Sequence, residues 1–480
     1  MRPIAYLLLA AISLLGAVAA ETRPHYGGTL RVMLQSAPSA LDLPANATPA
    51  EYWDLSRTLS LIGNTLVRID AQGRPQPALA VAWQSDASAS HWQFTLRRGV
   101  KFHDGSAASP AAIAQILGAL HSGWNVRAVA DSITIESAPP LPSLLAELAL
   151  PRNLALKRNA NGAPPVGTGP FLVAEWQPSQ FLKLAANEES WEGRPFVDAV
   201  EIEFGKAQRD QAIALELGKT DVIEEAPQSA SGSQPHSTSS VSLPTELLAL
   251  VFPVNSRAND PRLREALALA INRKPIQSVL LKGAGEPAAS ILPNWMTGFS
   301  AVFSAQANAQ EARILLADSH QPAPNLTCEL SYDPRDPQAQ LIAERIALNA
   351  REVGITVQVS LSGAEDIRLV RVVLPSPDPA TSLGEAARQL GLPQPAFSAT
   401  AGGDTLEDLY QTERSLLEAH AVIPLFHLPV ATAEGARVRD WSPERRGQWS
   451  ASRLSLADFW LSDLRSTASR ADLPGQAGSR

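Results

Sequence analysis

The chain of 480 residues contains a single cysteine, Cys328, and this scarcity limits the chemistry open to it. One thiol excludes an internal disulfide framework and any metal site built from several cysteines. The surrounding stretch, 326–330, is typical of a strand, so we interpret Cys328 as a small buried side chain rather than a nucleophile. No cysteine lies near the N-terminal segment, and we therefore expect no lipid anchor.

Long hydrophobic runs are also rare, because the only one lies at the N-terminus. Arg2 precedes an apolar stretch at 4–15, and small residues follow at 17–20. The stretch is shorter than the ~20 residues that a spanning helix needs, which favours a cleaved secretory signal over 1–20. A retained N-terminal anchor is the alternative. The signal predicts a secreted, periplasmic protein.

Positive charge is nowhere concentrated. The formal net charge is −8, and no run rich in Lys and Arg occurs, which argues against a nucleic-acid partner or an anionic membrane surface. The motifs G-x-S-x-G and H-E-x-x-H are both absent, and the eight histidines never fall four apart on one helix. We therefore predict no catalytic residues, no metal site, no cofactor and no enzyme activity.

The length of the chain indicates more than one lobe. A single hydrophobic core usually stops growing at ~250–300 residues, and this chain has 480. Hydrophobic residues make up 45% and charged residues 18%, an ordinary balance for a globular protein.

Two segments in the first half of the chain stand out. The segment WQFTLRRGVKFHDG (92–105) predicts a strand with Trp92, Phe94 and Leu96 on one face, followed by a turn at Asp104 and Gly105. We interpret His103 beside that turn as structural. The second segment is PVGTGPF (165–171), whose glycines predict a tight turn.

The second half has the strongest helix signal. Asp260 is a typical N-cap and Pro261 a typical first helical residue, and an apolar stripe then continues until Pro275. We also predict a helix over 336–354 that leads into a strand at 355–361, and a helix from Asp404 that precedes a strand at 422–426.

Taken in order, these segments resemble the family 5 solute-binding proteins, the extracytoplasmic receptors of peptide and nickel ABC importers. The segment at 92–105 is similar to the family pattern FxLRxGVKFHDG, and 165–171 is similar to VGTGPY. The resemblance implies an α/β, two-lobed periplasmic binding protein of type II, cluster C-like, with mixed sheets and an extra inserted subdomain in lobe one. The domain boundaries that it implies are 27–56, 163–250 and 441–465 for lobe one, 57–162 for the inserted domain and 251–440 for lobe two. The residues themselves predict the signal at 1–20 and a polar, disordered tail at 466–480.

The same resemblance implies a function. It predicts a periplasmic receptor that delivers oligopeptides or a similar small solute to an ABC permease and ATPase complex by hinge closure, and that acts as a monomer. The stretch 361–378 is short for the family, which motivates an alternative, a transport-inactive sensor of the same fold. A secreted hydrolase with an unrecognised site is the remaining alternative.

Ligand-binding candidates follow from what a receptor cleft needs, which is aromatic walls and a few fixed charges. Asp378 aligns with the last acid of the family segment W-x-x-DYPDP and could meet a peptide ammonium group. Tyr52, Trp53 and Trp295 are candidate wall aromatics, and Arg257 could pair with a ligand carboxylate.

Overall fold

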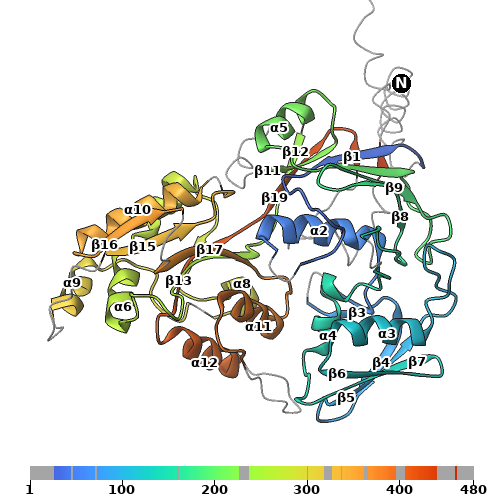
Figure 1. The fold of residues 1–480 in the computed structure, drawn as a ribbon, viewed down its shortest axis with the longest axis horizontal. Coiled ribbons are helices and arrows are strands. Elements are labelled where there is room, and N and C mark those ends of the chain that lie inside the picture. The colour runs from blue at the N-terminus through green and yellow to red at the C-terminus, as the bar shows by residue number, and fades with distance from the viewer. Residues whose placement is uncertain are drawn as a thin grey trace, which may run out of the picture.

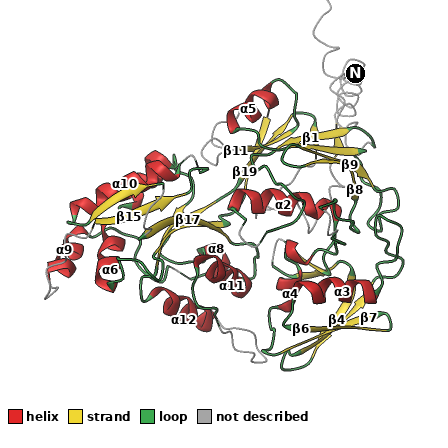
Figure 2. Cartoon of the chain, viewed as in Figure 1, coloured by secondary structure: helices red, strands yellow, loops and turns green. Residues whose placement is uncertain are grey.

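The computed structural model describes residues 26–44, 47–70, 73–158, 162–225, 237–299, 301–317, 327–336, 338–361, 366–395, 406–439 and 460–461. The predicted signal 1–20, the predicted tail 466–480 and most of the predicted segment 441–465 lie outside these residues. The described chain is a mixed α/β structure with two lobes (Figure 1), and both lobes contain helices and strands (Figure 2). The predicted fold class is confirmed. The predicted domain boundaries stay a prediction.

A seven-stranded mixed sheet forms the body of the first lobe. Its strands, in spatial order, are β12 (Ser237–Val241), β19 (Ala431–Gly435), β11 (Val222–Glu225), β1 (Thr29–Met33), β10 (Ala199–Glu203), β9 (Phe181–Ala186) and β8 (Phe171–Gln177). β1 pairs in parallel with β10 and β11, and the other pairings are antiparallel. Leu30 and Val32 of β1 are buried and share a core with Leu55 and Leu59 of helix α2 (Pro49–Ile62). Helix α5 (Gln208–Glu216) precedes β11.

A smaller antiparallel sheet belongs to the same lobe. Its strands, in order, are β4 (Ala80–Ser85), β5 (His91–Leu96), β7 (Ser132–Ser137) and β6 (Trp124–Val129). The prediction that Trp92, Phe94 and Leu96 share one face is confirmed, since all three are buried. They pack with helix α3 (Pro110–Leu120), where Ser109 is the N-cap. The remaining elements here are α4 (Leu144–Leu148), the 3₁₀ turn η1 (Pro151–Asn153), β2 (Val67–Ile69) and β3 (Pro75–Pro77).

The two marked segments of the first half lie against each other. The His103 backbone N–H donates to the Gly167 carbonyl at 2.9 Å, and the His103 Nε2 lies 2.9 Å from the Gly169 carbonyl oxygen. The Gly169 N–H donates in turn to the carbonyl of Ile62, the last residue of α2, at 2.8 Å. Both segments therefore fasten the small sheet to α2, and the structural interpretation of His103 is confirmed.

The second lobe is built on a six-stranded sheet. Its strands, in spatial order, are β14 (Glu286–Pro287), β18 (Val422–Leu428), β13 (Glu246–Val251), β17 (Ile367–Val373), β15 (Thr327–Tyr332) and β16 (Thr356–Ser360). Because successive strand residues point to opposite faces, Leu248 and Leu250 of β13 enter one core, and Leu247 and Ala249 enter the other. Helices cover both faces of this sheet.

The helices of this lobe divide between the two cores. On the first face lie α6 (Pro261–Ala270), α9 (Ala309–Ala317) and α10 (Ala339–Glu352), and on the second α11 (Pro379–Leu390) and α12 (Leu406–Leu417). Shorter elements are α7 (Arg273–Pro275), the π-helical turn η3 (Ile276–Leu280) and α8 (Asn294–Thr297), and β20 (Val438–Arg439) pairs with β21 (Trp460–Leu461).

The helix predicted over 260–275 is correct at its start and wrong at its end. The Asp260 side chain caps it by accepting the Arg262 N–H at 2.9 Å. The helix ends at Ala270 rather than at Pro275, because Ile271 is extended and fully buried. The Asn272 N–H then donates to the Asn349 side chain on α10. Tertiary packing here overrides the local apolar period.

One buried carboxyl group in this lobe has an unusual environment. Glu413 of α12 accepts the backbone N–H groups of Ile291 and Leu292 on Oε1, at 2.5 and 2.8 Å. Its Oε2 is buried, and no described residue hydrogen-bonds to it. Burial raises the pKa of Glu413 to about 7, against the backbone hydrogen bonds that act to lower it.

This raised pKa predicts a pH-dependent stability. Between about pH 4.5 and 7 the folded protein holds a proton on Glu413 that the unfolded chain has lost, so stability is present below that window and falls as pH rises through it. A shift of this size corresponds to about 3 kcal/mol. Urea unfolding of the wild type and of Glu413→Gln at pH 4.5 and 7.5 measures it. We expect the wild type to lose about 3 kcal/mol relative to the variant, and parallel profiles would contradict this assignment.

Candidate functional site

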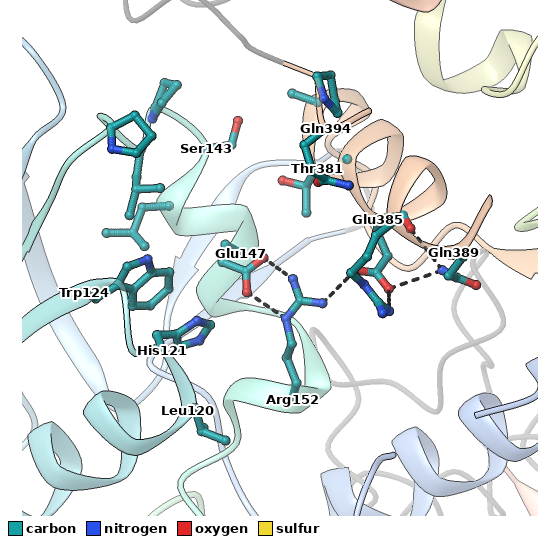
Figure 3. Close-up of a pocket in the computed structure, with 18 of the residues that line it drawn as sticks. Leu120, His121, Trp124, Ser143, Glu147, Arg152, Thr381, Glu385, Gln389 and Gln394 are labelled. Atoms are coloured by element: carbon teal, nitrogen blue, oxygen red, sulfur yellow. Dashed lines mark hydrogen bonds and ion pairs between the residues drawn. The ribbon is translucent and has the colours of Figure 1, made fainter. Parts of the chain in front are cut away.

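A cavity of about 740 Å³ is walled by both lobes, and we call it the main cavity. The first lobe contributes the segment before and at the start of α2 and the region from Leu120 to Arg152. The second lobe contributes α11 and the residues after it, up to Pro395. Figure 3 shows polar side chains from both lobes meeting in this space. The site therefore exists only because the two lobes face each other.

A chain of charged groups crosses the main cavity from one lobe to the other. Arg152, on the 3₁₀ turn η1, lies between Glu147 of α4 and Glu385 of α11 (Figure 3). Its Nε is 2.8 Å from Glu147 Oε1, and its Nη1 is 2.8 Å from Glu385 Oε2. Arg388, one turn after Glu385 on the same helix, donates to Glu385 as well. We call these four residues the charge ladder.

Two members of the charge ladder, Arg152 and Glu385, have pKa values shifted in the direction that favours their charged forms. Burial acts to lower the pKa of Arg152, but the charges and hydrogen bonds of Glu147 and Glu385 raise it overall. Burial acts to raise the pKa of Glu385, yet hydrogen bonds from Arg388 and the charge of Arg152 hold it below its ordinary range. The ladder contains two acidic and two basic side chains.

A second cavity, of about 840 Å³, lies beside the first and shares Ala47, Arg388 and Gln389 with it. Here Trp53 of α2 donates its indole N–H to Glu246 of β13 at 2.8 Å. Glu246 in turn pairs with Arg371 of β17, at 3.3 Å. This is a second polar contact between the lobes, and it is buried.

Two of the predicted site residues lie at these cavities. Tyr52 lines the main cavity, and burial raises the pKa of its phenol. Trp53 lines the second cavity, and its ring meets that of Tyr52 edge to face at 5.5 Å. Their contact with a ligand stays a prediction.

The other three predicted residues are not among the described residues that line either cavity. Asp378 is the N-cap of α11, where its Oδ2 accepts the Thr381 N–H at 2.8 Å. Trp295 donates its indole N–H to the Pro244 carbonyl at 2.8 Å. Arg257 binds the buried carboxylate of Asp366 through Nη2 at 2.7 Å. The structure gives each of the three a local partner, and their ligand roles stay predictions.

The charge ladder was not predicted from the sequence. Glu147 and Arg152 lie five residues apart, and Glu385 lies 233 residues beyond Arg152. The one local signal is an N-cap followed by proline at Asp378 and Pro379, which opens the helix that carries Glu385 and Arg388.

Among the described residues, no three His, Cys, Asp or Glu side chains gather closely enough to hold a metal ion. None of the helices that the structure describes has both the length and the apolar composition needed to cross a membrane.

Comparison with known proteins places these features in a family. The model of the bacterial extracellular solute-binding proteins, family 5 Middle, matches residues 128–372, which is 245 of the 480 residues. The nickel-binding periplasmic protein of Escherichia coli (strain K12) is 26% identical over 353 residues, covering 64% of this chain and 66% of that protein. The probable di/tripeptide-binding protein 5 of Pseudomonas aeruginosa (strain UCBPP-PA14) is 22% identical over 404 residues, covering 73% and 76%.

The alignments with four of the curated relatives cover between 37% and 66% of the relatives' own length, so the chain spans less than two thirds of each. Similarity in fold extends further. The dipeptide-binding protein of Pseudoalteromonas sp. SM9913, solved in complex with Met-Leu, superposes with a TM-score of 0.75 at 17% identity, covering 91% of this chain and all of that one.

Proposed function

Because the chain belongs to the bacterial extracellular solute-binding proteins of family 5, we propose that it is a periplasmic receptor that captures an oligopeptide or a similar small solute. In this proposal the two lobes close over the solute, and the closed form delivers it to an ABC permease and ATPase complex. Binding energy drives the closure, and no covalent chemistry is needed.

One observation carries the proposal, namely a cavity of about 740 Å³ with walls from both lobes. A cavity of this size falls within the ~300–1,000 Å³ that is typical of small-molecule sites. Two polar contacts already join the lobes beside it, Arg152 to Glu385 and Trp53 to Glu246. A solute enclosed there would touch both lobes at once, which is what couples binding to closure.

The solute class, the location and the oligomeric state in this proposal are supported by different observations. An oligopeptide is proposed because relatives are named as di/tripeptide-binding proteins. From the sequence we propose that the segment 1–20 is removed, that the protein is periplasmic and that it carries no lipid anchor. From the family resemblance we propose that it is a monomer. The predicted order of the domains belongs to the same proposal, while the sheets place β13 (Glu246–Val251) with the second lobe and β19 (Ala431–Gly435) with the first, close to the predicted changes at 250 and 440.

Purification from the native periplasm tests the proposal, because such a receptor is expected to retain its solute. Native mass spectrometry of the purified protein should show a bound species of small mass. The solute can then be removed by partial unfolding and dialysis, and added back. We expect small-angle scattering to give a smaller radius of gyration with the solute than without it.

Two results would contradict the proposal, each in a different way. Retention of a solute with no change in the radius of gyration would contradict closure. Failure to retain any solute, together with no binding from pools of peptides, sugars and metal chelates, would contradict the receptor function itself.

A further inference from the structure

The charge ladder consists of two ion pairs, and each pair lies within one lobe. In the first lobe, Arg152 donates to both carboxylate oxygens of Glu147, from Nε at 2.8 Å and from Nη2 at 2.5 Å. In the second lobe, Arg388 donates to both oxygens of Glu385 on the same helix, α11. A contact from Arg152 Nη1 to Glu385 Oε2, at 2.8 Å, joins the two pairs. The two halves of the ladder therefore meet across the boundary between the lobes.

Each half of the ladder is held in position by its own lobe. Asn153 donates to the Glu147 carbonyl at 2.6 Å and to Glu147 Oε1 at 3.1 Å, which fixes the carboxylate of the first lobe. Gln389 donates to Glu385 Oε1 at 3.2 Å, and its side chain is anchored on the backbone of Val373 in β17. The side chain of Glu385 is 5% exposed. The two halves therefore need little further ordering to meet, which lowers the entropy cost of the contact.

The contact between the halves can open without leaving a buried carboxylate alone. Breaking an ordinary buried ion pair is costly because one charge loses its partner. Here Arg152 keeps Glu147, and Glu385 keeps Arg388, when the lobes separate. What is lost is a charge-assisted hydrogen bond, which shifts an equilibrium by roughly 10-fold to 100-fold. A contact of this strength can bias the lobes toward each other and still let them open.

The contact lies away from the points where the chain crosses between the lobes. The crossings follow β12 and β18, and they lie side by side because the Ser242 N–H donates to the Val430 carbonyl at 2.9 Å. Residues 429–431 of one crossing line the second cavity, whereas the described residues that line the main cavity include none from either crossing. A hinge motion separates distant groups more than groups beside the hinge. Opening of the lobes about these crossings therefore breaks the contact between Arg152 and Glu385.

We propose that the contact between Arg152 and Glu385 is a reversible latch that favours closure of the lobes before any solute binds. This inference rests on the proposed function and adds a means of regulating the same site. The latch supplies part of the free energy of closure in advance, so the apparent affinity for a solute rises with the population of the closed form. Glu385 is then a positioning residue, because it acts on the distance between the lobes.

Spin labels on the two lobes test the latch in the solute-free protein. The single cysteine, Cys328, is 1% exposed, so Val129→Cys on β6 and Leu406→Cys on α12 provide two exposed labelling sites, one on each lobe (Figure 1). Pulsed electron paramagnetic resonance measures the distances between the two labels. We expect a short distance from the closed form and a long distance from the open form. Glu385→Gln should lower the ratio of short to long distances by about 10-fold.

Two comparisons link the shift to the contact itself. Glu201→Gln makes the same chemical change in an ion pair within one lobe, since Glu201 of β10 pairs with Lys183 of β9 at 2.8 Å, and it should leave the ratio unchanged. Arg152→Gln should lower the ratio as Glu385→Gln does. The double variant should lower it no further, because either substitution alone removes the contact. Thermal melts check that each variant folds.

The results that would overturn the latch differ from those that would overturn the proposed function. The latch is wrong if Glu385→Gln leaves the ratio unchanged, or if the effects of the Arg152 and Glu385 substitutions add. The proposed function stands in that case, provided that the solute recovered from the wild-type protein converts the long distance into the short one. A long distance that persists at saturation with that solute would contradict closure, and the proposed function and the latch would fail together.

Discussion

Replacement of Gly169 by alanine is expected to lower the free energy of unfolding by about 3 kcal/mol or more, the upper end of the range for overpacking a core. An added Cβ would lie 2.6 Å from the Leu61 carbonyl oxygen and 2.6 Å from the Ile62 carbonyl carbon. Both contacts are with backbone at the end of α2, which cannot move aside as a flexible side chain can.

The structural reason why position 169 requires glycine differs from the reason that the sequence suggested. The prediction was a tight turn that alanine would strain, yet Gly169 is not among the glycines with positive φ. Glycine is required because the Gly169 N–H donates to the Ile62 carbonyl at 2.8 Å, and this close approach leaves no space for a Cβ atom. The effect of the substitution therefore falls on the junction between α2 and the small sheet.

Gly118→Ala provides the control for this substitution. Gly118 lies inside α3, and a Cβ there would meet nothing within 4 Å. Alanine should therefore raise stability by up to ~1 kcal/mol, the ordinary gain in a helix interior. Urea unfolding of the wild type and the two variants measures the decrease in stability expected for Gly169→Ala and the increase expected for Gly118→Ala. Equal stability of Gly169→Ala and the wild type would contradict the close approach of Gly169 to the end of α2.

Local signals in the sequence were sufficient for elements whose period is unambiguous. Trp92, Phe94 and Leu96 alternate with polar residues, so their burial on one face follows from the geometry of a strand. The N-cap at Asp260 followed by Pro261 fixed the start of α6 for an equally local reason. These features do not depend on the rest of the chain.

The same local signal was missed where a family pattern competed with it. Asp378 and Pro379 repeat the cap-and-proline signal of Asp260 and Pro261, but the resemblance to the family segment W-x-x-DYPDP favours a ligand contact for Asp378. The structure has a twelve-residue helix, α11, starting at Pro379. The family motif suggested a ligand-binding role for Asp378, and the helix α11 that carries Glu385 was therefore not predicted.

The candidate site itself was beyond the reach of the sequence. Trp53 and Glu246 lie 193 residues apart, and Arg152 and Glu385 lie 233 residues apart. Each pair forms only when the two lobes face each other. The resemblance predicted that a cleft exists between the lobes, whereas the identity of its charged groups depends on how α11 and η1 are packed.

The second large expected effect is a loss of solute binding when the main cavity is filled by a substitution at Gly384. Gly384 lies on α11 and lines the cavity, and a Cβ there would meet nothing within 4 Å. A tryptophan at this position would project into the space that the proposed solute occupies. We expect Gly384→Trp to weaken binding by on the order of 100-fold or more through direct exclusion.

Gly384→Ala is the matched control, because it changes the same residue without filling the cavity. It should bind as the wild type does and should be slightly more stable, by up to ~1 kcal/mol, as expected for alanine in a helix. Thermal melts of both variants show whether a loss of binding comes from a filled cavity or from unfolding of a lobe.

Calorimetric titration of the wild type, Gly384→Ala and Gly384→Trp with the solute released from the wild-type protein tests the central claim most directly. Binding by the first two and its loss in a folded Gly384→Trp would place the solute in the cavity between the lobes. Equal affinity in all three would mean that the solute binds elsewhere, and this account of the protein would be wrong.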